Sequence, residues 1–245
     1  MSEYIEGVGE VETPKSLKDR AVNFWYHYKW HSVISLILVL VLIVCSFQFC
    51  KKESYDIHVM YAGPYVVGKT ASDGNEAEIV KVLSSLKKVT KDFDGDENVR
   101  VNFTNFLYMS AEEIENNDSD VDYAFISSDK KSLEAALEYS EYYLCFISPS
   151  VYEEYNEMGD IDMFMPLNEY SEYVSADAFY SDNAIKLSEL PFKNLPGISA
   201  LPDDTLVCIK TPSVLASKSK DHMECLSRAE ETLINILKFD QEALN

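Results

Sequence analysis

The chain has 245 residues, of which 42 are Asp or Glu and 21 are Lys or Arg, so its formal net charge at pH 7 is −21. This acidic excess argues against a nucleic-acid partner, because affinity for nucleic acid depends on Lys and Arg that neutralise phosphates. The five cysteines include no CxxC pair, so the spacing of a zinc finger or a disulfide-rich secreted domain is absent.

The first 31 residues are predicted to form a cytoplasmic arm that contains an interfacial aromatic helix. Ser16 followed by Asp19 resembles the capping pattern that begins a helix, here extending to Trp30. The stretch 24–30 reads FWYHYKW, and Trp and Tyr rings prefer the headgroup level of a membrane. The alternative is an aromatic helix that packs against a partner protein.

Residues 32–50 contain no charged side chain. A helix of nineteen residues is roughly 28 Å long, close to the hydrocarbon thickness of a bilayer. A cleaved signal peptide has a shorter apolar core and a small-residue cleavage site, and neither is present. Buried core helices rarely lack every charge over such a length, so the run predicts a single transmembrane helix with the lipid bilayer as its partner.

The flanking charges orient this helix by a small margin. Four basic residues precede the helix and three follow it: Lys15, Lys18, Arg20 and Lys29, then Lys51, Lys52 and Lys69. The positive-inside rule therefore predicts a cytoplasmic N-terminus, a linker over residues 51–54 and an extracytoplasmic domain over residues 55–245. That domain holds 36 acidic and 15 basic residues, and 15 − 36 = −21 is the net charge of the whole chain.

Apolar periodicity in the outer domain alternates between strand and helix. The predicted strands are 56–61, 98–108, 121–126, 143–147 and 205–210. The predicted helices are 76–91, 111–116, a helix capped by Ser128 or Asp129 and ending at Glu138, 149–156 and 218–237. This alternation predicts an α/β fold of three layers, with a mainly parallel or mixed sheet.

Ligands of such folds gather at the carboxyl ends of the parallel strands. The candidate ligand-binding residues at these ends are Gly63, Tyr65, Ser127, Ser128, Asp129, Ser148 and Ser150. Two of the ends precede helix N-termini, whose free N–H groups can hold a small polar or anionic group. The alternative is that the Ser and Asp side chains are helix caps.

Closely spaced oxygen ligands suggest calcium at Asp92, Asp94, Asp96 and Asn98. An EF-hand loop, however, requires Gly where Glu97 stands, so a polar turn between a helix and a strand is the favoured interpretation. No cofactor is expected. Two further alternatives are a sugar-binding surface formed by the tyrosines between 139 and 180, and a disulfide between Cys145 and Cys208 if their strands are neighbours.

The sequence contains no GxSxG, HExxH, P-loop or GxGxxG motif, and only His58 and His222 lie outside the membrane region. Both histidines are interpreted as structural or surface residues. The acidic residues are too numerous for one pair to stand out as an acid and a base. An enzyme is therefore not predicted.

Two resemblances add to this reading. The stretch 24–31, the single apolar run, Tyr55-Asp56-Ile57 and Tyr61-Ala62-Gly63 together resemble uncharacterised single-pass membrane proteins of clostridia-like bacteria. Residues 122–126 (DYAFI) and 165–170 (MPLNEY) are similar to segments in one lobe of extracytoplasmic solute-binding proteins. The second resemblance implies a lobe-like fold, but two complete lobes usually need a longer chain.

The expected function is a non-enzymatic, membrane-anchored extracytoplasmic domain that binds a protein partner or a small ligand at the cell envelope. A cell-envelope hydrolase with paired carboxylates and a structural anchor without a ligand are the alternatives.

Overall fold

The computed structural model describes residues 16–50, 54–68, 77–115, 123–156 and 162–240. The chain divides into two compact units, Met1–Glu53 and Ser54–Asn245. The second unit is called the C-terminal domain below.

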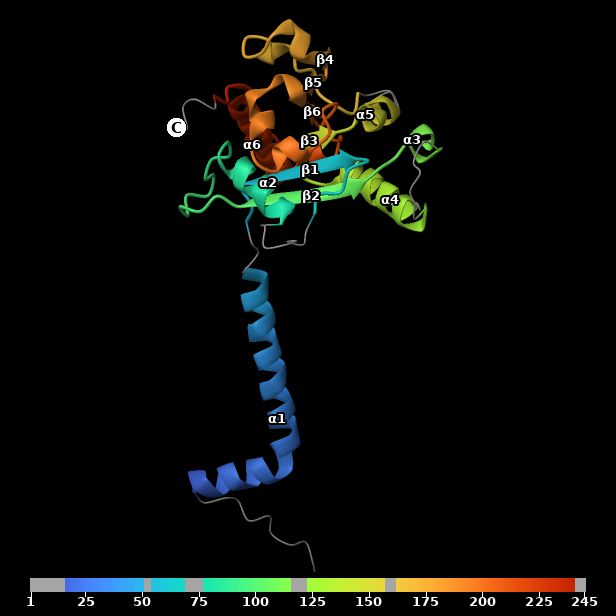
Figure 1. The fold of residues 1–245 in the computed structure, drawn as a ribbon. Helices are drawn as coiled ribbons and strands as arrows, with labels where there is room; N and C mark the ends of the chain where they lie inside the picture. Colours follow the sequence, from blue (N-terminus) through green and yellow to red (C-terminus); the bar gives the residue numbers. More distant parts are fainter. Residues whose placement is uncertain (1–15, 51–53, 69–76, 116–122, 157–161, 241–245) are drawn as a thin grey trace, which may run out of the picture. The chain divides into compact units, whose positions relative to one another are not determined.

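The described part of the N-terminal unit forms one long helix, α1, Leu17–Cys50 (Figure 1). It joins the two predicted helical stretches, and its first turns are bent away from the rest. Within it, Phe24–Ser46 is 23 residues long and apolar enough to cross a membrane, and none of its most apolar part is buried. Since it lies near the N-terminus, this helix is compatible with a membrane anchor or a signal sequence.

The C-terminal domain is built on one mixed sheet of six strands in the order β2-β1-β3-β6-β5-β4 (Figure 1). Strand β1 is parallel to β2 and β3, whereas the β3–β6, β6–β5 and β5–β4 pairs are antiparallel. The strand bounds are β1 Ile57–Gly63, β2 Val101–Leu107, β3 Leu144–Ile147, β4 Phe179–Ser181, β5 Ala184–Lys186 and β6 Leu206–Ile209. The α/β class is therefore confirmed, with a mixed rather than a mainly parallel sheet.

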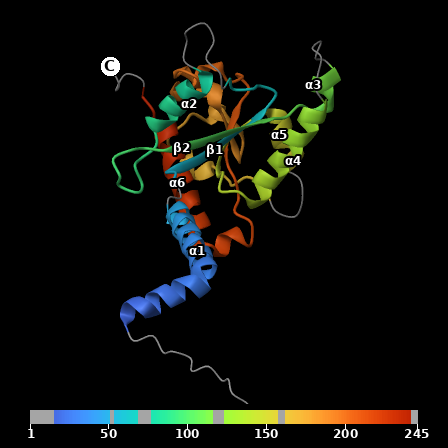
Figure 2. The same ribbon diagram turned by 90° about the horizontal axis from the view of Figure 1, so that it is seen from below.

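Helices cover both faces of the sheet, and Figure 2 shows them on opposite sides of β1 and β2. The helix bounds are α2 Glu78–Lys87, α3 Ala111–Glu115, α4 Tyr123–Tyr139, α5 Pro149–Asn156 and α6 Lys220–Leu237. Val59 and Tyr61 of β1 pack into one core cluster with α2 and α6, while Met60 joins a second cluster with α4 and α5. Alternate residues of a strand point to opposite faces, so the apolar run of β1 supplies both cores.

One predicted strand is wrong. The described part of 121–126 forms the first turn of α4, and Val121 and Asp122 lie outside the described residues. In this turn only Ile126 is buried, whereas Tyr123 and Phe125 are 66% and 50% exposed. A short apolar run cannot distinguish a buried strand from a helix turn, and here α4 begins before the predicted cap at Ser128 or Asp129.

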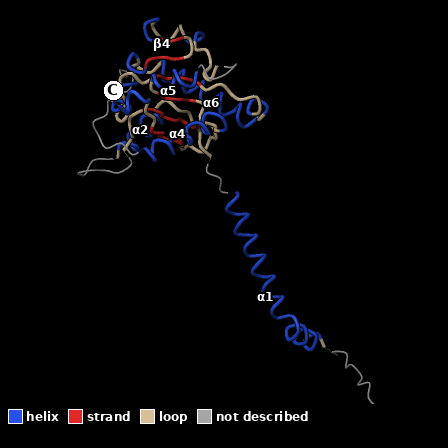
Figure 3. Tube along the Cα trace, turned by 90° about the vertical axis from the view of Figure 1, so that its right-hand side faces the viewer, coloured by secondary structure: helices blue, strands red, loops and turns tan. Residues whose placement is uncertain are grey.

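The short strands β4 and β5 were not predicted. Each has three residues, and they form an antiparallel hairpin at the edge of the sheet (Figure 3). Before them and after them the chain forms several 3₁₀ turns, among them Leu187–Glu189 and Pro191–Asn194, with buried Leu187 and Phe192. Such short elements carry too few residues for a periodic pattern.

Cys145 and Cys208 face each other across the β3–β6 pair. Their strands are neighbours, as the disulfide alternative requires, but both cysteines are free and fully buried. Burial raises the pKa of the Cys145 thiol to about 12, so both side chains act as small apolar residues of the core.

Candidate functional site

Three of the predicted ligand-binding residues meet at the carboxyl ends of β1 and β3. The backbone N–H of Ser148 donates to the carbonyl of Ala62 (2.9 Å), which places Ser148 beside Gly63. A Cβ atom at Gly63 would lie 3.2 Å from the Ser148 Cβ. The Oγ atoms of Ser148 and Ser150 are 2.9 Å apart, and Ser148 Oγ accepts the N–H of Val151 (3.3 Å) in the first turn of α5.

The other predicted residues lie elsewhere. Asp129 reaches the end of β2 from within α4, where its Oδ2 accepts the N–H of Leu107 (2.9 Å). Ser127 and Ser128 are exposed on α4. Tyr65 donates to Glu78 Oε1 (2.5 Å) of α2. The Ser148 and Asp129 side chains thus satisfy backbone N–H groups, as the capping alternative expects for Ser148.

The predicted calcium ligands form a tight turn over residues 92–98, called the acidic turn here. Asp92 accepts the N–H groups of Gly95 (2.7 Å) and Glu97 (2.6 Å) through its two oxygens. Arg100 pairs with Asp96 and lies 3.8 Å from Asp94. Backbone donors and one guanidinium therefore already satisfy these carboxylates.

Buried Asp56 anchors the acidic turn to β1. Its two oxygens accept the N–H groups of Phe93 (2.7 Å) and Arg100 (2.8 Å), and only 2% of the residue is exposed. Its carboxylate lies within 4.8 Å of those of Asp92 and Asp94. The carboxylates of the acidic turn are thus satisfied by contacts within the turn and by Arg100, and Asp56, the residue before β1, links the turn to the sheet.

A groove of about 460 Å³ lies where α4, α5 and the segment after β6 meet. Its walls include the apolar side chains of Leu137, Met163 and Val214 and three carboxylates, while no Lys or Arg lines it among the described residues. The carboxylates are those of Glu134, Glu138 and Asp162. We call this feature the acidic groove.

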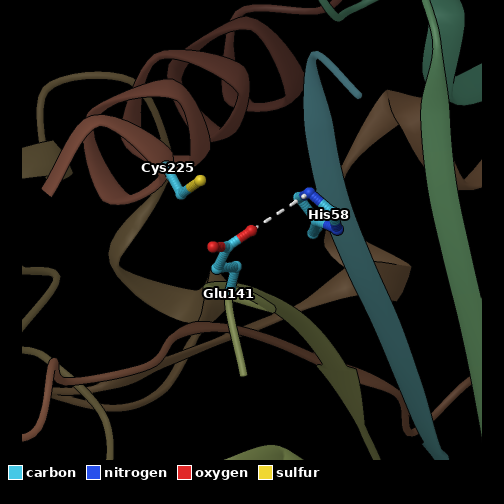
Figure 4. Close-up of side chains that lie close together, drawn as sticks. All are labelled: His58, Glu141 and Cys225. Atoms are coloured by element: carbon cyan, nitrogen blue, oxygen red, sulfur yellow. Dashed lines mark ion pairs between the residues drawn. The ribbon is translucent and has the colours of Figure 1, made fainter. Parts of the chain in front are cut away.

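A second cluster lies at the amino end of β1, where three elements bring His58, Glu141 and Cys225 together (Figure 4). His58 is in β1, Glu141 precedes β3 and Cys225 is in α6. One ligand atom of each lies within 4.8 Å of the others, and His58 Nε2 is 3.5 Å from Glu141 Oε2. All three residues are partly exposed, so solvent and solutes can reach them.

The electrostatics of this cluster do not suit a cysteine nucleophile. Burial, followed by the Glu141 carboxylate, raises the pKa of the Cys225 thiol to about 11, and Arg228 opposes this shift only in part. Reactive cysteines instead have lowered pKa values in electropositive surroundings. Cys225 is therefore a protonated thiol at neutral pH, in surroundings that favour an added positive charge.

Neither the acidic groove nor this cluster was predicted from the sequence. His58 was interpreted as a structural or surface residue and Glu141 and Cys225 had no predicted role, because the three residues lie far apart in the chain and follow no motif spacing. The groove residues come from two helices and two loops, so no local pattern reports them either. The cluster's only sequence signal is that His58 is one of two histidines outside α1.

Comparisons with the profiles of known protein families, with curated proteins and with solved structures found no match.

Proposed function

We propose that this chain is a non-enzymatic, membrane-anchored protein whose C-terminal domain lies outside the cytoplasm and binds a protein partner in the acidic groove. The observation that carries the proposal is the combination of apolar walls with three carboxylates and no lining base among the described residues. The complementary surface is a segment that presents Lys or Arg beside an apolar side chain.

The exposed apolar surface of α1 supports the proposed membrane anchor. Its apolar side chains from Ile34 to Val44 are about half exposed, for example 63% for Leu36 and 54% for Leu40. A helix with this much exposed apolar surface needs an apolar environment, and hydrocarbon supplies it. The aromatic side chains at the start of the apolar stretch, such as Trp25 (59%) and Trp30 (70%), are equally exposed and suit the headgroup region.

The groove suits a peptide segment better than a small solute because its apolar surface continues beyond its walls. Val214 lines the groove and is 63% exposed, and the next residue, Leu215, is 78% exposed. Exposed neighbouring apolar side chains rimmed by charge are typical of protein-binding surfaces. Lys and Arg lay long alkyl stems on apolar walls while their charged ends reach carboxylates, so they match both parts of the groove.

A peptide of alternating Leu and Arg, labelled with a fluorophore, tests this chemistry on the full chain in uncharged detergent. We expect saturable binding that weakens with salt, and no binding of the same peptide with Glu in place of Arg. The double variant Glu134→Lys/Glu138→Lys should weaken binding roughly 5- to 30-fold, since two exposed ion pairs together contribute roughly 1–2 kcal/mol.

The matched control is Glu172→Lys/Glu189→Lys, which changes the charge equally at two exposed positions outside the groove. Equal weakening by both double variants would show attraction to the net charge alone and would overturn the groove as the site. A photo-crosslinking residue at Val214, introduced in intact cells, should then capture a partner that the groove variant loses.

Orientation has its own test. A protease added to intact cells should digest a C-terminally tagged chain and leave an N-terminal tag protected. Protection of the C-terminal tag would place the domain in the cytoplasm and contradict the extracytoplasmic part of the proposal.

The three groove carboxylates also suit the competing function, a hydrolase with paired acids. That function requires hydrolysis of a glycan to be abolished by Glu134→Gln or Glu138→Gln. If the full chain does not hydrolyse the glycan, the hydrolase alternative is wrong and partner binding stays the proposed function of the groove.

A further inference from the structure

The cluster at the amino end of β1 carries the chemistry of a metal site. We propose that His58 Nε2, Glu141 Oε2 and Cys225 Sγ bind one Zn²⁺ ion, with the fourth position open to water or to a ligand atom. The three ligand types are those that zinc uses in proteins, and three protein ligands with one open position are the usual composition of its reactive sites.

The ligand set selects the metal. A thiol is a poor ligand for Mg²⁺ and Ca²⁺, which prefer oxygen atoms alone. Imidazole, carboxylate and thiolate together suit a borderline-soft ion with tetrahedral geometry. Glu141 supplies the negative charge of the site, because Glu224 and Arg228 near Cys225 pair with each other (2.6 Å) and their opposite charges largely offset one another.

The observed distances are close to those of a bound ion. With bonds of about 2.0–2.1 Å and a tetrahedral angle, a nitrogen and an oxygen on one zinc ion lie roughly 3.4 Å apart. His58 Nε2 and Glu141 Oε2 are 3.5 Å apart. The Cys225 sulfur lies within 4.8 Å of a ring nitrogen of His58 and of a carboxylate oxygen of Glu141. A zinc–sulfur bond of about 2.3 Å requires roughly 3.6 Å, so a side-chain movement of up to about 1 Å completes the site.

The other ring nitrogen of His58, Nδ1, already contacts a side chain of the neighbouring strand β2. The amide Nδ2 of Asn102 in β2 lies 2.9 Å from His58 Nδ1, and the same amide group contacts the Tyr142 hydroxyl (3.2 Å). Zinc at Nε2 requires a proton on Nδ1 and an oxygen that accepts it. A 180° rotation of the Asn102 amide supplies that oxygen, and Tyr142, which contacts Thr104 (2.7 Å), can then donate to the amide oxygen.

The test uses the full chain in detergent, reduced and without a histidine tag, titrated with Co²⁺ as a spectroscopic probe and then with Zn²⁺. We expect one metal ion per chain and a thiolate-to-Co²⁺ charge-transfer band in the near ultraviolet, which Zn²⁺ abolishes by displacement. Cys225→Ser should remove the band and weaken Zn²⁺ binding more than tenfold. His58→Gln should weaken binding similarly while leaving folding, followed by circular dichroism, unchanged.

Two control variants test whether other side chains of the chain bind the metal instead. Cys208→Ala removes a fully buried thiol and Asp92→Asn/Asp94→Asn alters the acidic turn, and both should keep the band. Asn102→Asp should tighten Zn²⁺ binding, because a carboxylate behind a metal-bound histidine raises its basicity, an effect of roughly 10–100-fold in metal affinity. Absence of a band in the unaltered chain, or a band that persists in Cys225→Ser, would overturn the proposal.

Discussion

Lys210 is a buried cation whose protonation should control the stability of the C-terminal domain at alkaline pH. The residue is 2% exposed, and its Nζ donates to the carbonyls of Ala136 (3.0 Å) and Ser140 (2.7 Å) at the end of α4. The same nitrogen lies 5.1 Å from the ring centroid of Tyr143. Burial nevertheless lowers the pKa of Lys210 from 10.5 to about 8.

The sign of the effect follows from proton counting. Between pH 8 and 10.5 the unfolded chain keeps the proton on Lys210 while the folded chain releases it, so the free energy of unfolding rises with pH in this window. Each unit of pKa difference corresponds to about 1.4 kcal/mol. Burial of Lys210 therefore lowers the free energy of unfolding by about 3 kcal/mol at pH 7 and by about 1 kcal/mol at pH 9.5.

Urea unfolding of residues 54–245 at pH 7 and pH 9.5 measures this effect when the unaltered domain is compared with Lys210→Met. Both proteins share the buried tyrosines, such as Tyr143 with its pKa raised to about 12 by burial, which act in the opposite direction as pH rises. The stability of the unaltered domain relative to the variant should increase by about 2 kcal/mol between the two pH values. A change below about 0.5 kcal/mol would refute the reasoning, because it would mean that the two carbonyls and the ring hold the pKa near its ordinary value.

Three further predictions concern backbone and loop features of the same domain. Asp56→Ala removes two charge-assisted hydrogen bonds to backbone N–H groups and should lower the free energy of unfolding by about 3 kcal/mol in urea; a loss below about 1 kcal/mol would contradict this role. Gly197 has φ +81° and a Cβ there would lie 2.5 Å from the backbone nitrogen of Val82, so Gly197→Ala should cost more than about 2 kcal/mol, whereas Gly95→Ala, with φ +76° and open space, should cost only about 1 kcal/mol. Equal losses would refute the steric argument. Adding Ca²⁺ and then removing it with a chelator should leave the thermal midpoint unchanged, because Arg100 and backbone donors already satisfy the acidic turn; a rise of more than about 2 °C would revive the calcium prediction.

The continuous apolar strands and the amphipathic helices were predicted well from the sequence. The buried runs of β1, β3 and β6 are apolar on both faces, and α2 and α6 show apolar residues at helical spacing, so local pattern and tertiary burial agree. The prediction was wrong at the start of α4, because its apolar side chains, Tyr123 and Phe125, are exposed and give no periodic signal.

The candidate sites also include residues whose positions could be predicted from the sequence and residues whose positions could not. Ser148 follows β3 at the sheet edge, where a strand followed by a helix was predicted. Asp129 instead reaches the end of β2 from within α4, because the strand predicted before it is the first turn of that helix. The acidic groove and the cluster of His58, Glu141 and Cys225 could not be predicted. The groove residues come together only after α4, α5 and the segment after β6 have packed, and the cluster residues only after β1, β3 and α6 have packed.

The sequence by itself determined the long apolar helix, the concentration of charge in the C-terminal part and the α/β class, since composition and periodicity are local properties of the chain. Only the tertiary structure decided which half of the sheet is antiparallel and which distant side chains share a site. Strand register and helix packing depend on contacts between segments far apart in the chain, and those contacts leave no periodic trace in the sequence.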